Sequence, residues 1–143
     1  MIRRGVNQYQ SVGLKSGVEE ATPYQLIQML MAGALEKIAQ AKGHMERRNI
    51  AAKGEHISWA ISIIGGLQAS LNKDNGGELA ANLDALYDYM VRRLAEANAS
   101  NDPGMLDEVS SLMREVKSGW DGIAPIVNQN AATTPAGMRA GAY

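Results

Sequence analysis

Four stretches of the chain carry apolar residues every three or four positions, which is the spacing of one face of an α-helix. The first begins at Thr22-Pro23, since threonine suits an N-cap, proline suits the first helical position and Gln25 completes a capping box. It ends near residues 47–49, where two arginines suit a helix C-terminus. Between these signals the apolar positions are Ile27, Leu30, Met31, Ala34, Leu35, Ile38, Ala41 and Met45.

A second helix is predicted from about Ile50 to Leu71, and its apolar positions spread over roughly 200° of the helix circumference. Contact with a single neighbouring helix requires a much narrower apolar face. Either this helix contacts two neighbours, or part of the face is a groove for an amphipathic helix of another chain. Within it, Gly65-Gly66 predicts a close approach of another backbone or a bend.

Two further helices follow short turns. A turn rich in Asn and Gly at residues 72–77 precedes a helix from about Glu78 to Asn98. Asp102 as N-cap and Pro103 begin the last helix, whose apolar spacing continues to Val127. The core stripe of the third helix is Leu79, Leu83, Leu86, Tyr87, Met90, Leu94 and Ala97. The pattern predicts an all-α fold, an antiparallel up-down four-helix bundle over residues 22–127.

The segments that flank this bundle lack a sustained amphipathic period. We expect residues 1–21 to form a flexible N-terminal arm and residues 128–143 to form a disordered C-terminal tail. Ile2, Val6 and Tyr9 lie at helical spacing within the arm, so a helical turn can form there on a docking surface.

Composition excludes several classes of function. The 143 residues are the size of one domain, and 14 Lys plus Arg against 15 Asp plus Glu argue against a nucleic-acid partner. The absence of Cys excludes disulfides, thiolate zinc sites and cysteine nucleophiles. Neither a signal peptide nor a run of roughly 20 apolar residues is present, so we expect a cytoplasmic protein without membrane insertion.

Candidate chemistry is sparse. His44 and His56 are the two histidines, and neither lies in a Glu-x-x-His pair of di-metal bundles, so we expect no metal and no cofactor. The adjacent acids Asp107-Glu108 suit capping and solvated charge rather than acid–base catalysis. We therefore expect no catalytic residue and no enzyme.

Histidine phosphotransfer is an alternative function with a defined chemical mechanism. Histidine phosphotransfer domains are four-helix bundles with a reactive histidine, commonly followed after two residues by Lys-Gly. His56 is followed by Ile-Ser-Trp-Ala, so Trp59 stands where the phosphate-stabilising cation would be. This interpretation and that of a generic helical adaptor stay open at this point.

The third helix carries a family resemblance. Residues 76–98, with Gly-Gly-Glu-Leu-Ala at their start, Leu-Tyr-Asp-Tyr-Met at 86–90 and Arg93-Leu94 after them, strongly resemble the flagellar export chaperone family FliS. Tyr9 and residues 21–34 upstream, and residues 108–120 downstream, continue the match. The resemblance implies a cytoplasmic bundle that binds the C-terminal segment of flagellin, prevents premature polymerisation and delivers flagellin to a component of the flagellar type III export gate. A homodimer is a further possibility.

The flagellin groove is predicted on the second and third helices. The candidates are Ile57, Ile61, Ile64, Gln68, Leu71, Leu86, Tyr89 and Arg93, with Val6 and Tyr9 from the arm. Each aliphatic candidate suits the core equally well. Tyr89 is the strongest candidate, because it lies roughly 100° from the centre of its core stripe. We expect the arm to dock on apolar surface of the free bundle and flagellin to displace or rearrange it.

Overall fold

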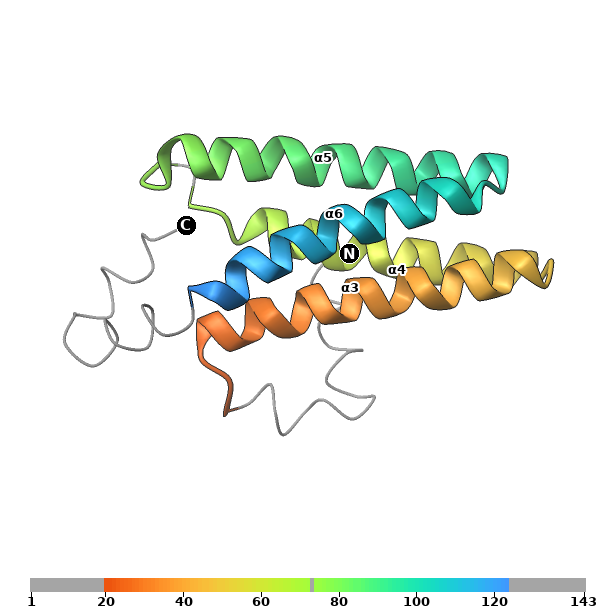
Figure 1. Ribbon diagram of the computed structural model, residues 1–143, viewed down its shortest axis with the longest axis horizontal. Helices are drawn as coiled ribbons and strands as arrows, with labels where there is room; N and C mark the ends of the chain where they lie inside the picture. Colours follow the sequence, from red (N-terminus) through yellow and green to blue (C-terminus); the bar gives the residue numbers. More distant parts are fainter. Residues whose placement is uncertain (1–19, 73, 124–143) are drawn as a thin grey trace.

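The structure is a computed structural model that describes residues 20–72 and 74–123. Within these ranges the chain forms four α-helices and no strand (Figure 1). They are α3 (Pro23–Glu46), α4 (Ile50–Ala69), α5 (Gly77–Ser100) and α6 (Pro103–Gly122). The tail, Val127 and the arm up to residue 19 lie outside the described residues, so the predicted domain boundaries stay predictions.

Local chemistry sets two helix starts as predicted. The Thr22 Oγ1 accepts a hydrogen bond from the Gln25 amide at 3.1 Å, and the Thr22 amide donates to the Gln25 Oε1 at 3.0 Å. This reciprocal pair is a capping box, followed by Pro23 at the first helical position. At α6, the Asp102 carboxylate accepts from the Gly104 amide at 2.8 Å.

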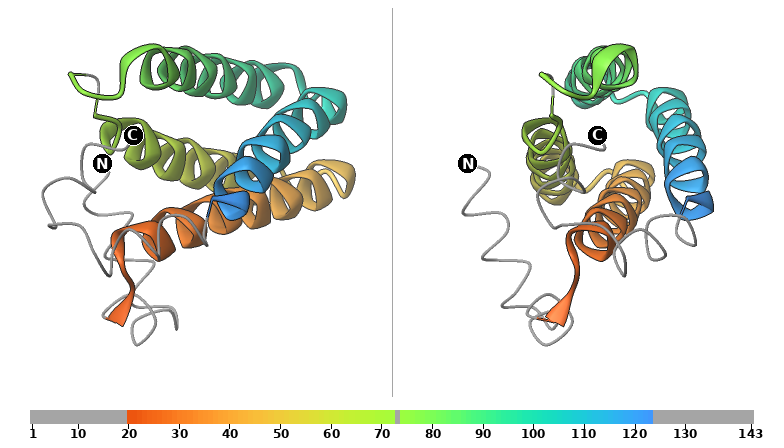
Figure 2. Two further views of the ribbon diagram at one scale, coloured as in Figure 1. Left: turned by 60° about the vertical axis from the view of Figure 1, so that its left-hand side comes forward. Right: turned by 90° about the vertical axis from the view of Figure 1, so that its left-hand side faces the viewer.

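The helices form an antiparallel ring of four. Contacts join α3 to α4, α4 to α5, α5 to α6 and α6 back to α3. The end-on view shows the four helices at the corners of this ring (Figure 2). The prediction of an all-α four-helix bundle is confirmed. Since α4 contacts both α3 and α5, two neighbours account for most of its wide apolar arc.

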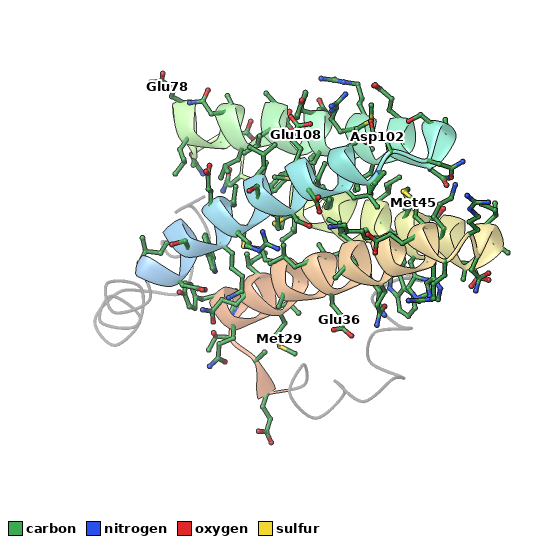
Figure 3. The ribbon with its side chains drawn as sticks, turned by 45° about the vertical axis from the view of Figure 1, so that its right-hand side comes forward. Met29, Glu36, Met45, Glu78, Asp102 and Glu108 are labelled. Atoms are coloured by element: carbon green, nitrogen blue, oxygen red, sulfur yellow. The ribbon has the colours of Figure 1, made fainter. Side chains whose placement is uncertain are left out.

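Helix α6 crosses the bundle obliquely. It leaves the short turn after α5 beside the C-terminal end of that helix and approaches the N-terminal end of α3 (Figures 1 and 2). Asp102 and Met45 lie toward one end of the bundle and Glu78 at the other (Figure 3). Consequently α5 and α6 are close at the end that carries Asp102 and diverge toward the end that carries Glu78.

Burial follows this divergence. Near the α5–α6 turn the core is closed, with Leu94, Ala97, Leu106, Val109 and Met113 all fully buried. Toward the other end, Ala80 is the only buried residue in 77–86, and no residue of 114–123 is buried. The prediction that Leu79 belongs to the core is wrong: it is 59% exposed, because α6 has moved away from α5 at this level.

Candidate functional site

An apolar cleft of about 340 Å³ opens between the diverging ends of α5 and α6. This volume lies at the lower end of the range for ligand cavities in proteins. All four helices contribute to its mainly apolar wall, through Ile27, Met31, Leu67, Leu71, Leu79, Leu83, Tyr87, Val116, Trp120 and the adjoining Ile123. We call this cavity the end cleft. It accepts a few apolar side chains at a time.

The edges of the end cleft leave apolar surface in contact with water. Leu79 on α5 is 59% exposed and Ile123 after α6 is 36% exposed. Deeper in the cleft, burial raises the pKa of Tyr87 to about 12, so its hydroxyl is neutral at physiological pH. A larger hollow of about 640 Å³ beside the start of α3 is shallow, and its wall mixes polar side chains such as Gln25, Gln28 and Lys117 with apolar ones.

One wall of the end cleft is fixed by contacts between α3 and α6. The Tyr24 hydroxyl donates to the Trp120 carbonyl at 2.7 Å, and the Trp120 indole N–H donates to the Tyr24 carbonyl at 3.1 Å. Their rings stack with centroids 5.1 Å apart. Asp121 accepts from Gln28 at 2.7 Å and pairs with Lys117 at 2.8 Å, and these bonds lower the pKa of Asp121. The C-terminal turn of α6 is thereby held to α3.

Farther along α6, a polar cluster joins it to α5. Glu108, labelled in Figure 3, lies on α6. It accepts a hydrogen bond from the Tyr89 hydroxyl at 2.5 Å and from Arg93 Nε at 2.9 Å. The two bonds lower the pKa of Glu108. Arg93 also pairs with Glu96 at 3.1 Å. We call Tyr89, Arg93 and Glu108 the α5–α6 clasp.

The residues predicted on the second helix fall into two groups. Ile57 and Ile64 are 1% and 0% exposed, so they lie in the core. Ile61, Gln68 and Leu71 are half-buried, and Leu71 lines the end cleft. The Gln68 side-chain amide donates to the carboxylates of Asp84 and Asp88 across the α4–α5 seam, at 2.9 and 2.8 Å.

The groove candidates predicted on the third helix do not line the end cleft. Leu86 is half-buried against the core, and Tyr89 and Arg93 belong to the clasp rather than to the wall of the end cleft. Val6 and Tyr9 lie outside the described residues. Contact of any of these residues with a partner stays a prediction. The sequence prediction of the site did not include Glu108, Val116 or Trp120, because their position depends on where α6 crosses the bundle.

The two histidines lie side by side where α3 contacts α4. The rings of His44 and His56 have centroids 4.8 Å apart, and His56 Nδ1 lies 2.8 Å from the Ala52 carbonyl oxygen. Desolvation lowers the pKa of His44, and the proximity of His56 and Arg47 adds to this effect. Within the part of the chain that the structure describes, no three His, Cys, Asp or Glu side chains are placed to hold a metal ion.

Comparison with known proteins decides the family. The family model described as "Flagellar protein FliS" matches residues 5–127. The chain belongs to the FliS family. The FliS-family chain is 57% identical over 121 residues to the flagellar secretion chaperone FliSB of Pseudomonas aeruginosa, covering 85% of this chain and 96% of that protein. It is 44% identical to the flagellar secretion chaperone FliS of Vibrio cholerae over 124 residues, which are 87% of this chain and 91% of that protein.

FliS is a family of chaperones, so the prediction that the chain is not an enzyme is confirmed by its family. Membership likewise supports a role in flagellar secretion. The names of these relatives specify no client. No described helix has the length and apolar character needed to cross a bilayer.

Proposed function

We propose that this FliS-family chain is a cytoplasmic export chaperone that binds the C-terminal segment of flagellin in the end cleft. Binding would keep that segment from polymerising prematurely until the chaperone delivers it to a component of the flagellar export gate. The observation that carries the proposal is an apolar cavity, with exposed Leu79 and Ile123 at its edges, in a member of a secretion chaperone family.

The size of the end cleft indicates how the client binds. A segment that is disordered alone orders only if burial of apolar area, at about 25 cal/mol per Å², exceeds its conformational entropy. A cavity of about 340 Å³ buries only a few side chains. The client therefore anchors an amphipathic helix in the end cleft and continues over neighbouring surface of the bundle.

The direct test is binding of a synthetic peptide that covers the C-terminal segment of flagellin from the same bacterium. We expect helicity of the mixture, measured by circular dichroism, to exceed the sum of the parts. Leu79→Asp should weaken binding at least about tenfold, because it places a charge on the apolar edge of the cleft. Ile50→Asp is the matched control, since Ile50 is 55% exposed at the opposite end of the bundle. An unchanged protein that binds no peptide overturns the proposal.

A second measurement identifies the occupant of the end cleft. A photoreactive p-benzoylphenylalanine at position 79 of the full chain should form a covalent adduct with the flagellin peptide. Adducts only with a second copy of the chain would instead identify the cleft as a dimer interface. Adducts only within one chain would identify it as a docking site for the chain's own terminal segments. Either of these two results contradicts flagellin binding at this cleft.

A further inference from the structure

Two carboxylates lie on the same flank of α6 with different surroundings. Glu108 and Glu115 are seven residues apart, which is nearly two helical turns and about 10 Å along the axis. Glu108 shows that this flank faces α5, because it bonds both Tyr89 and Arg93 there. Glu115 therefore points toward the same neighbour, at the level where α5 has diverged and the end cleft opens.

Glu115 has no cationic partner comparable to Arg93, which pairs with Glu108. It is exposed and lines the end cleft, and within residues 20–72 and 74–123 it makes no ion pair or hydrogen bond. On α5, the positions seven residues before Tyr89 and Arg93 are Asn82 and Leu86. Helix α5 thus offers no cation at the level where Glu115 faces it.

The other walls of the end cleft do not supply a cation either. No charged side chain occurs in residues 21–35, which include the N-terminal half of α3, or in residues 57–72, which include the C-terminal part of α4. On α6, Lys117 is paired with Asp121, and Arg114 points about 100° away from Glu115 as its neighbour in the helix. Lys73 lies outside the described residues. The charge at the cleft mouth is therefore negative and uncompensated by these walls.

We infer that Glu115 determines client specificity by pairing with a lysine or arginine of the segment that occupies the end cleft. This inference rests on the proposed function. The segment is an amphipathic helix whose apolar side chains enter the cleft and whose cation lies at the edge toward α6. That cation takes the role at Glu115 that Arg93 has at Glu108.

The test compares charge variants of the full chain for binding to the flagellin peptide. We expect Glu115→Gln to weaken binding about threefold to tenfold and Glu115→Lys to weaken it further, because a cation then faces a cation. Glu55→Gln and Glu55→Lys are matched controls, since Glu55 is exposed on α4 near the opposite end of the bundle. Both controls should bind as the unchanged chain does.

Salt and a charge-neutralised peptide complete the experiment. Raising the ionic strength should weaken binding by the unchanged chain more than binding by Glu115→Gln. Replacing the peptide's lysines and arginines with glutamine one at a time should reveal one position at which Glu115→Gln adds no further loss. If Glu115 variants bind normally while Leu79→Asp does not, the inference fails and the proposed function stands. If the unchanged chain binds no peptide, both fail.

Discussion

Glu108 is the residue on which the α5–α6 clasp depends, because it accepts hydrogen bonds from both other members. A carboxylate whose pKa is lowered in the folded protein stabilises the fold when ionised. The contribution is complete above the pKa of an unfolded glutamate, near 4.3, and is lost as the pH falls through the lower folded pKa. The contribution of the Glu108 carboxylate to the clasp is therefore lost in acid.

We expect Glu108→Gln to lower stability at neutral pH and to remove this acid dependence. The difference in free energy of unfolding between the unchanged chain and the variant should shrink as the pH falls from about 6 to about 3. Urea denaturation at several pH values measures it. Asp121, whose pKa is also lowered, is present in both proteins and cancels in the difference. A difference that stays constant with pH would contradict the role of Glu108.

Lys53 has an unusual position for a lysine, since it is only 3% exposed. Its ammonium donates to the Asn98 carbonyl at 2.9 Å and to the Asn101 side-chain oxygen. Asn101 ends α5 with a φ of 53°, in the left-handed region that asparagine tolerates. A cation from α4 thus lies at the C-terminus of α5, where the helix dipole favours positive charge.

Lys53→Met keeps the aliphatic stem and removes the ammonium. We expect a loss of about 2 kcal/mol in the free energy of unfolding, because a hydrogen bond to a charged group disappears and leaves its acceptors unpaired. Lys42→Met is the control, because Lys42 pairs with Asp107 at 2.9 Å on the surface, and its loss of stability should be clearly smaller. Equal losses would show that the burial of Lys53 adds nothing.

At the level of elements, polar contacts join α6 to both of its neighbours. The clasp joins it to α5, and the Lys42–Asp107 ion pair and the contacts of Tyr24 and Gln28 join it to α3. At the open end the last turn of α6 is bonded to α3, and the end cleft lies between this turn and the diverging part of α5. Polar contacts on two neighbouring helices thus help to hold α6 in the position that forms one wall of the cleft.

Tyr24→Phe tests the attachment of the last turn of α6 to α3. It removes the hydroxyl that donates to the Trp120 carbonyl at 2.7 Å and retains the stacked ring. We expect a loss of about 1 kcal/mol and faster amide hydrogen exchange in the last turn of α6, residues 117–122. Tyr89→Phe is the matched variant at the clasp, and its faster exchange should be centred near residue 108. Identical exchange patterns would contradict two separate attachments.

Local signals allowed much of the element structure to be predicted. Thr22 and Asp102 begin helices through hydrogen bonds within a few residues, so their neighbours in the sequence suffice. Leu79 was assigned wrongly because its heptad position is apolar, whereas its exposure depends on where α6 lies. The end cleft could not be predicted for the same reason: it arises from a crossing angle set by Tyr24 and Trp120, which are 96 residues apart.

For the whole molecule, the two ends of the bundle should differ in local stability. The closed end contains fully buried Leu94, Leu106 and Val109, while residues 77–86 and 114–123 bury little. We expect slower amide exchange at the closed end of the free chain. Saturation with the flagellin peptide should slow exchange mainly in those two segments. At a peptide concentration 100 times Kd it should raise the free energy of unfolding by about 2.7 kcal/mol. A uniform slowing across all helices would contradict binding at the end cleft.

The chain contains two tryptophans, and their placement has a practical consequence. Trp120 forms part of the cleft wall, whereas Trp59 lies on α4 beneath the ammonium of Lys37, 3.7 Å from its ring centre. A peptide that displaces water from the cleft wall changes the surroundings of the Trp120 indole and leaves those of Trp59 unchanged. Trp59→Phe would therefore yield a protein with a single tryptophan, Trp120, whose emission wavelength under selective excitation reports occupancy of the cleft without any attached dye.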